Sequence, residues 1–220
     1  MIAVFLQARM DSSRLPGKAL LPLQGKPIVQ VIMQRLKHIE ADLHLLVTDR
    51  EGKQCFSAVA KEAGFLVFEG PKFDVLERFC QAIRAYQPGT VIRATGDNPL
   101  VSWELANQIL KEHLSLQADY SALQGMPIGL GVEVIRAQSL LEAAQETEDP
   151  YDREHVTPFL YKNPQRYYLH RPLVELAYRG RYRVTVDTEE DYQKIRSLYS
   201  RFQDPEPSLA TLMSFLQKEA

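Results

Sequence analysis

The sequence predicts an α/β protein with a mostly parallel central sheet and helices on both of its faces. In the first half of the chain, short apolar runs alternate with longer segments in which apolar residues recur every three or four positions. This alternation is typical of βαβ units, whose strands pair in parallel. The 220 residues, 45% of them hydrophobic, are enough to bury one sizeable core.

Apolar runs rich in β-branched and aromatic residues predict the strands of the parallel sheet. These runs cover residues 2–6, 43–47, 65–68 and 90–94. Helical periodicity predicts the helices that connect and follow the strands. They are expected over residues 26–40, 51–63, 73–86 and 101–116.

The second half of the chain is less regular. Further strands are predicted at residues 119–123, 131–135, 167–170 and 181–186, and further helices at 137–144, 153–162, 189–202 and 208–218. The segment Asp204-Pro205-Glu206-Pro207 is typical of a hinge. We therefore expect one main domain over residues 1–203 and a helical tail over residues 204–220.

Charge and composition exclude several classes of function. The 26 basic and 28 acidic residues nearly balance, which argues against a general nucleic-acid or membrane-surface binder. No stretch approaches the ~20 apolar residues of a membrane span, and the opening apolar run is too short for a signal peptide. Cys55 and Cys80 form no CxxC pair and are expected to be buried, reduced thiols. We therefore expect a cytoplasmic protein.

A cationic loop follows the first predicted strand. A glycine-containing cationic loop at this position is how many α/β proteins hold phosphate. The chain as a whole has a net charge of −2, whereas the stretch from residue 7 to residue 26 carries four cations and one anion, namely Arg9, Arg14, Lys18, Lys26 and Asp11.

Two common nucleotide-binding motifs do not match this loop. A Walker A loop needs glycine at position 12 and serine or threonine after the lysine, but this chain has Ser12 and Ala19. The dinucleotide fingerprint GxGxxG is absent after the first strand. We expect a different anion loop, in which Arg9, Arg14 and Lys18 converge on a polyphosphate. The alternative is a solvated basic turn.

Two aspartates, Asp97 and Asp187, each follow a predicted strand. Mg²⁺ is usually held by one or two carboxylates plus substrate phosphates, so together the pair predicts a metal–nucleotide site facing the cationic loop. Each aspartate also has a simpler interpretation. Asp97 lies in a Gly-Asp-Asn-Pro turn, and Asp187 with Glu190 has the spacing of a helix N-cap.

Other polar residues are open to two interpretations. His155 lies in the dense polar run 151–158, which is typical either of a site or of an acidic helix N-terminus. Arg179, Arg181 and Arg183 alternate and would share one face of a strand. Such a stripe is either solvated or directed at an anionic substrate or a partner subunit.

The cationic loop itself, Gln7-Ala-Arg-Met-Asp-Ser-Ser-Arg-Leu-Pro-Gly-Lys18, resembles the opening motif of the cytidylyltransferase superfamily. It is most similar to the spore coat polysaccharide biosynthesis proteins of the F type, relatives of the CMP-acylneuraminate and CMP-3-deoxy-manno-octulosonate synthetases. The resemblance runs from residue 1 to about residue 200. Further matching motifs lie at residues 74–79, 93–100, 153–158 and 184–191.

The resemblance implies a nucleotide-diphosphosugar-transferase fold, a Rossmann-like sheet with a β arm that often pairs two subunits into a homodimer. It also implies CMP transfer from CTP to a sugar, with Mg²⁺ as cofactor and pyrophosphate as leaving group. The sugar is expected to be acidic and the product to serve cell-surface polysaccharide synthesis. The alternatives are another nucleoside triphosphate, or a nucleotide-binding relative without turnover.

The resemblance also assigns residues. The nucleotide-binding set is Gln7, Ala8, Arg9, Ser12, Arg14, Lys18, Asp74, Arg78, Thr95, Gly96 and Asp97. The catalytic residues are Arg9, Lys18, Asp97 and Asp187, of which the two aspartates bind the metal. The sugar-facing set is Glu133, Arg153, Glu154, His155 and Arg183. This chain departs from many relatives at Gly131, where they carry aspartate.

Overall fold

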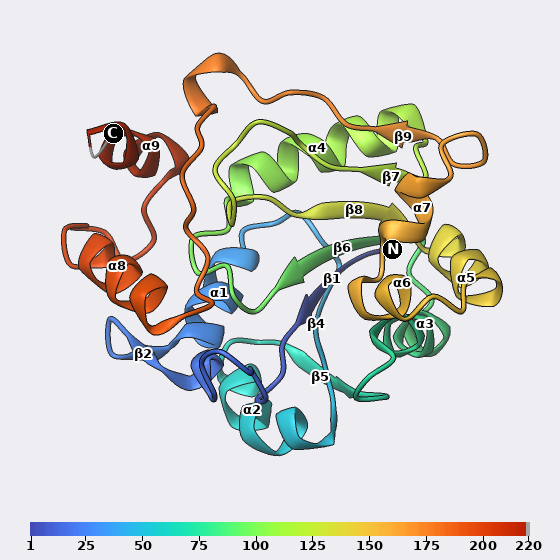
Figure 1. Ribbon diagram of the computed structural model, residues 1–220, viewed down its shortest axis with the longest axis horizontal. Coiled ribbons are helices and arrows are strands. Elements are labelled where there is room, and N and C mark those ends of the chain that lie inside the picture. Colours follow the sequence, from blue (N-terminus) through green and yellow to red (C-terminus); the bar gives the residue numbers. More distant parts are fainter. Residues whose placement is uncertain (219–220) are drawn as a thin grey trace.

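A seven-stranded sheet forms the centre of the computed structural model, which describes residues 1–218; residues 219 and 220 of the predicted tail lie outside it. The strand order is β5-β4-β1-β6-β8-β7-β9 (Figure 1). The first four strands pair in parallel, as predicted, and are β1 (Ile2–Gln7), β4 (Leu43–Thr48), β5 (Leu66–Glu69) and β6 (Thr90–Thr95).

The remaining strands extend the sheet beyond β6. β8 (Glu133–Arg136) runs antiparallel to β6, β7 (Tyr120–Ser121) runs antiparallel to β8, and β9 (Leu169–His170) runs parallel to β7. Because β8 is antiparallel to β6, its first residue, Glu133, pairs with Arg93 in the carboxyl-terminal half of β6. A carboxylate from β8 therefore reaches the edge of the sheet where the parallel strands end.

Helices cover both faces of the sheet, which confirms the predicted fold class (Figure 1). Along β1, Val4 and Leu6 face one apolar cluster, whereas Ala3 and Phe5 face the other. The first cluster is completed by α1 (Ile28–Leu36), α2 (Arg50–Glu62), α4 (Trp103–Leu116), α8 (Glu189–Tyr199) and α9 (Leu209–Lys218). The second face carries α3 (Val75–Tyr86), α5 (Ala137–Glu146), α6 (Pro150–His155) and α7 (Pro158–Lys162).

The cationic loop contains short elements that the sequence did not predict. Gly17 has a φ of 70°, a conformation that favours glycine, and a short 3-10 helix, η1 (Lys18–Leu20), begins directly after it. A two-stranded ribbon of β2 (Pro22–Leu23) and β3 (Lys26–Pro27) then leads into α1. A second 3-10 helix, η2 (Leu176–Tyr178), lies much later in the chain.

The predicted strand at residues 181–186 is wrong. The segment is extended, but its backbone donors go to loops: Val184 N donates to Ile128 O at 2.8 Å, and Val186 N donates to Asp97 O at 2.8 Å. Only the isolated bridge between Ile128 and Arg183 resembles strand pairing. The hydrogen bond from Val186 to Asp97 places the next residue, Asp187, beside the end of β6.

The single helix predicted over residues 153–162 is also wrong. It is two helices, α6 and α7, separated at Val156, which has a φ of 73°. Pro158 begins the second helix, a position where the N–H that proline lacks would have no partner within the helix.

Cys80 is buried as predicted, but Cys55 is exposed on α2, so the prediction of burial is wrong for that thiol. Among residues 1–218, no helix has the length and apolar character needed to cross a membrane. The tail packs onto the main core, where Leu212 and Met213 are buried. Buried Arg35 also donates to Pro207 O at 3.2 Å. The division of the chain at residue 204 stays a prediction.

Candidate active site

A cleft of about 350 Å³ lies between the loops that follow β1 and β6. Gly96 N donates to Gln7 O at 2.8 Å, and a Cβ at position 96 would lie 2.8 Å from the Ala8 Cβ, so glycine lets the two loops touch. Most of the predicted site residues line this cleft, namely Gln7, Ala8, Arg9, Ser12, Arg14, Lys18, Arg78, Thr95, Gly96, Asp97, Glu154, His155 and Asp187.

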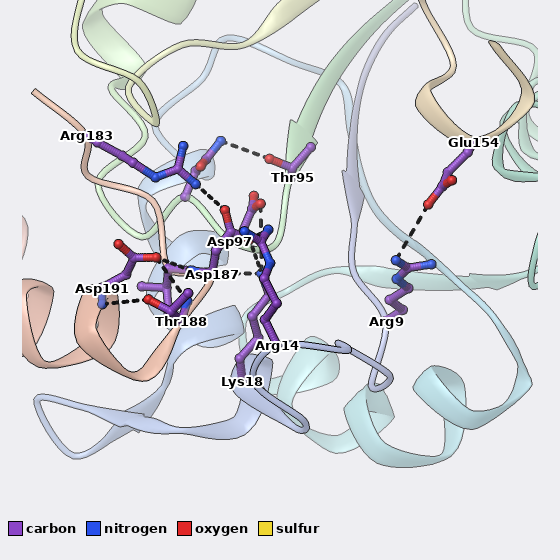
Figure 2. A network of polar contacts seen from close by, with 12 residues as sticks. Arg9, Arg14, Lys18, Thr95, Asp97, Glu154, Arg183, Asp187, Thr188 and Asp191 are labelled. Atoms are coloured by element: carbon purple, nitrogen blue, oxygen red, sulfur yellow. Dashed lines mark hydrogen bonds and ion pairs between the residues drawn. The ribbon is translucent and has the colours of Figure 1, made fainter. Parts of the chain in front are cut away.

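Lys18 lies between the two predicted metal ligands (Figure 2). Its Nζ is 2.9 Å from Asp187 Oδ1 and 4.0 Å from Asp97 Oδ2. Arg14 Nη2 is 3.1 Å from Asp187 Oδ1, and Arg183 pairs with the other oxygen of the same carboxylate. The structure therefore gathers three cations around Asp187, with Asp97 beside them.

Asp187 is not the helix cap that its spacing with Glu190 allowed. The N-cap of α8 is Thr188, whose hydroxyl accepts from Asp191 N at 3.2 Å. Asp191 closes a capping box by accepting from the backbone N–H of Thr188 at 3.0 Å. The Asp187 carboxylate is thus left to face Lys18 and Arg14 rather than the helix.

Asp97 supplies a carboxylate oxygen of the kind that coordinates a divalent metal. Its Oδ1 is buried and, within residues 1–218, has no hydrogen-bond partner. Unpaired carboxylate oxygen is the ligand type that Mg²⁺ prefers. The described part of the chain holds no cluster of three or more Asp, Glu, His or Cys side chains able to bind an ion alone. The pair Asp97 and Asp187 therefore fits a metal that takes its other ligands from phosphate oxygens and water.

Arg9 lies apart from this cluster, beside α6 (Figure 2). Its guanidinium is 3.7 Å from Glu154 Oε1 and 3.9 Å from Asp11 Oδ1. Lys72 approaches the same aspartate at 2.8 Å, and its hydrogen bond holds the pKa of the Asp11 carboxyl below the ordinary value. Arg14 and Lys18 thus meet at Asp187, whereas Arg9 flanks the cleft from another side. Convergence of the three cations on a polyphosphate stays a prediction.

Three residues predicted to bind nucleotide or sugar, Asp74, Arg78 and Arg153, instead pair with other groups of the protein. Asp74 caps α3 by accepting from Glu77 N at 2.9 Å, and its other oxygen lies 3.1 Å from Arg153. Buried Arg78 donates to Lys72 O at 2.7 Å and to a second carbonyl of the same loop. These side chains position the loop after β5.

A second cavity of about 580 Å³ adjoins the cleft, because Arg93 and Thr95 line both. Glu133 lies in its wall, where Oε1 accepts from Tyr120 Oη at 2.6 Å and from Thr157 Oγ1 at 2.8 Å. Arg93 pairs with the other oxygen of Glu133. Burial, together with the nearby Glu133 carboxylate, raises the pKa of Tyr120, so the phenol stays a donor.

Sequence reasoning missed several residues of this second cavity. Arg93, Tyr120 and Arg171, which line it, had no assigned role, and neither had Thr157, which donates to Glu133. Arg93 nevertheless lies in a matched motif and alternates with Thr95 along β6. Gly131 also lines the cavity. A Cβ at that position would lie 2.1 Å from Met126 Cε, so Met126 fills the space that a side chain would take.

Comparison with known proteins gives one consistent result. A family profile described as cytidylyltransferase matches residues 3–219. The spore coat polysaccharide biosynthesis protein SpsF of Bacillus subtilis is 34% identical over 229 residues, covering 99% of this chain and 94% of that protein.

Solved structures agree. A cytidylyltransferase from Leptospira borgpetersenii superposes with a TM-score of 0.92 at 27% identity, covering 99% of this chain and 94% of that one. A CMP:2-keto-3-deoxy-manno-octonic acid synthetase, solved with CTP, superposes with a TM-score of 0.70 at 17% identity, covering 91% and 98% of the two chains. At that identity the second similarity establishes the fold alone.

Proposed function

The chain belongs to the cytidylyltransferase family, and from this membership we propose that it transfers CMP from CTP to a sugar and releases pyrophosphate. The observation that carries the proposal is the meeting of Lys18 and Arg14 with Asp97 and Asp187 in a cleft that opens into a second cavity. Such a site has cations for a triphosphate, carboxylates for a metal, and adjoining room for an acceptor.

The cations act on the triphosphate. Phosphoryl transfer asks the protein mainly for positioning and charge neutralisation. Arg9, Arg14 and Lys18 would bind the β- and γ-phosphates and neutralise the pyrophosphate as it leaves. The backbone around Gln7 and Gly96, with Ala8, Ser12 and Thr95, would form the floor of the cleft.

The metal assignment rests on Asp97 and Asp187. Mg²⁺ held there would supply Lewis-acid polarisation of a phosphate oxygen. The protein's own part is to keep Asp97 Oδ1 unpaired and to keep Asp187 directed at the cleft through the capping box of α8.

The second cavity is the proposed sugar site. Glu133, Glu154 and His155 were expected on the sugar side; Glu133 lines this cavity, and the other two line the cleft beside it. Arg153 and Arg183 are already paired with Asp74 and Asp187, so binding an acidic sugar through either would require exchange of that partner.

The nucleotide is tested separately from turnover. The rival function keeps the fold but uses UTP, GTP or dTTP. Tighter ligands raise the melting temperature more, so ranking the four nucleotides with Mg²⁺ by thermal shift distinguishes these functions. Nucleotide binding without pyrophosphate release, across a broad panel of sugars, would favour a relative that lost turnover.

The decisive comparison for the metal site is pyrophosphate release from CTP by the wild type and by Asp97→Asn. We expect the variant to lose about 10²–10³-fold in rate, as when a preorganised charge-stabilising group is removed. Undiminished turnover in the variant would exclude Asp97 as a metal ligand.

The proposed product is an activated sugar for cell-surface polysaccharide, and we place its synthesis in the cytoplasm, where CTP is made. We also propose that two chains associate as a homodimer through the β arm that the family resemblance implies. The resemblance is the support for this proposal. Analytical ultracentrifugation measures that state directly.

A further inference from the structure

The link between α6 and α7 has an unusual backbone conformation at Val156, with a φ of 73° and a ψ of −52°. Thr157 N donates to His155 O at 2.9 Å, so the three residues form a γ-turn of the rare, strained kind with positive φ. A positive φ is especially unfavourable for a β-branched residue. Among residues 1–218, the other non-glycine residues with a positive φ are all glutamines, namely Gln24, Gln87 and Gln117.

Several contacts hold Val156 in this conformation. Its side chain is fully buried in the apolar cluster that Ala3 and Phe5 face. Its N–H donates to Asp152 O at 2.9 Å. The Asp152 carboxylate, on α6, lies 2.6 Å from the Lys162 ammonium on α7, so an ion pair spans the turn. A strained residue persists only where its surroundings impose the strain, and such residues gather at functional sites.

The two sides of the turn belong to different cavities. Glu154 and His155, before it, line the cleft, and Glu154 lies 3.7 Å from Arg9 (Figure 2). Thr157, directly after it, donates to Glu133 Oε1 at 2.8 Å, and Glu133 lines the second cavity. The turn therefore sets where the wall of one cavity stands relative to the wall of the other.

A second connection between the two cavities passes through Arg93. Its guanidinium pairs with the other oxygen of Glu133, and its Nη2 donates to Gln7 Oε1 at 3.2 Å. Gln7 ends β1, two residues before Arg9. The contacts thus form a closed circuit, from β1 through β6, β8, the γ-turn and α6 back to the loop after β1. A shift of the turn would move groups in both cavities.

We propose that Val156 is a positioning residue for the transfer reaction, whose γ-turn sets the acceptor cavity at the productive distance from the cleft. The inference rests on the proposed function, in which the cleft holds CTP and the second cavity a sugar. Bound reactants react fast only when the reacting atoms meet at about 3–3.5 Å, and a displacement of about 1 Å can cost about 100-fold in rate. Val156 is fully buried, so it acts through Thr157 and His155 rather than by touching a substrate.

Steady-state pyrophosphate release tests this role in the full chain. The assay uses CTP, Mg²⁺ and the sugar, from a panel of acidic and neutral sugars, on which the wild type is fastest. In Val156→Ala the loss of packing lets the residue relax to a negative φ. We expect kcat to fall about 10- to 100-fold, while the KM for CTP and its calorimetric Kd stay within about threefold of the wild type. Expressing kcat per CTP-binding site, counted by calorimetry, removes the effect of misfolded protein.

Val156→Gly separates the backbone from the packing. Glycine adopts a positive φ as readily as a negative one, although it leaves a larger gap in the core than alanine does. The γ-turn is therefore better populated in the glycine variant, and its kcat should exceed that of Val156→Ala by at least about threefold. A role in packing alone predicts the opposite order.

Val91→Ala is the matched control. Val91 is a fully buried valine of the same apolar cluster, but it lies near the start of β6 and lines neither cavity. This variant should lose stability yet keep the wild-type kcat per site. Thr157→Val removes the donor to Glu133 at the end of the turn and should lower kcat about 10-fold, which keeps the test decisive if Val156→Ala folds poorly.

The outcomes separate the two proposals. A wild-type kcat per site in folded Val156→Ala or Thr157→Val overturns the positioning role and leaves the proposed function intact. An equal fall in Val91→Ala, or a lower kcat in Val156→Gly than in Val156→Ala, also overturns it. Absence of pyrophosphate release by the wild type with every sugar of the panel overturns the proposed function itself, and the inference falls with it.

Discussion

The ammonium of Lys18 lies 2.9 Å from Asp187 Oδ1, joining residues that are 169 positions apart in the sequence. The same ammonium donates to Val186 O at 2.7 Å. The loop after the first strand is thereby tied to the segment that leads into α8. Because Asp187 is also a proposed metal ligand, Lys18 and a divalent ion compete for one carboxylate.

This competition predicts the effect of Lys18→Met on metal binding. Removal of the ammonium should raise the affinity of the nucleotide-free protein for Mn²⁺ about fivefold, the scale of one ion pair of about 1 kcal/mol. Electron spin resonance of free Mn²⁺ measures that affinity without turnover. Lys26→Met is the matched control, because Lys26 is exposed and its ammonium contacts the side chain of Gln34. Unchanged Mn²⁺ affinity in Lys18→Met would contradict the shared site.

The close approach of two loops at Gly96 predicts that Gly96→Ala disturbs the cleft. The added Cβ would lie 2.8 Å from Ala8 Cβ and 3.1 Å from Gln7 O, closer than packed atoms sit. We expect the free energy of unfolding to fall by about 1–3 kcal/mol and CTP affinity to fall with it. Urea denaturation and CTP titration measure the two effects.

Gly89→Ala controls for the loss of glycine itself. A Cβ at Gly89 has its nearest neighbour, Met1 O, at 4.0 Å. This variant should stay within about 0.5 kcal/mol of the wild type and bind CTP normally. Wild-type CTP affinity in Gly96→Ala would show that the two loops can separate without consequence for the nucleotide.

The hydrogen bonds to Glu133 predict a graded loss of stability. Glu133→Gln removes the charge that pairs with Arg93, and it should lower the free energy of unfolding by about 2–3 kcal/mol. Tyr120→Phe removes one donor to the same carboxylate and should lower it by about 1 kcal/mol. Urea denaturation ranks the two variants, and an equal loss in both would argue against the charged pair as the larger contribution.

Buried His113 predicts a dependence of stability on pH. Burial lowers its pKa from the ordinary 6.5 to about 4, and its Nδ1 lies 2.9 Å from Ser121 Oγ. Between these values the unfolded chain binds a proton that the folded protein does not, so stability falls as the pH falls. The contribution from pH 7 to pH 5 is about 2 kcal/mol.

Urea denaturation at pH 7 and pH 5 measures this loss in the wild type and in His113→Gln. The variant cannot take up the proton, so its stability should fall less between the two pH values. A fall as large as that of the wild type would assign the pH dependence to other groups.

Local patterns predicted the parallel half of the sheet well, because each strand there is a short apolar run followed by a helix. The segment 181–186 shows where such patterns fail. Its alternating arginines indicate an extended backbone, which it has, but period two does not say whether a neighbouring strand is available. The donors of Val184 and Val186 go to loops instead.

In the site, too, some features were predictable from local patterns and others depend on how distant segments pair. The cations of the loop and the position of Asp97 at the end of β6 followed from the order of elements along the chain. The pairing of Glu133 with Arg93 did not, because it depends on β8 running antiparallel, which no local pattern encodes.

The central proposal, CMP transfer to a sugar, is tested most directly by mass spectrometry of the reaction products. The protein is incubated with CTP, Mg²⁺ and a panel of acidic and neutral sugars, and pyrophosphate is measured in the same samples. We expect a CMP-linked sugar that forms in equal amount with pyrophosphate, and its loss in Asp97→Asn. Tight binding of CTP with neither product formed, for any sugar of the panel, would contradict the proposal.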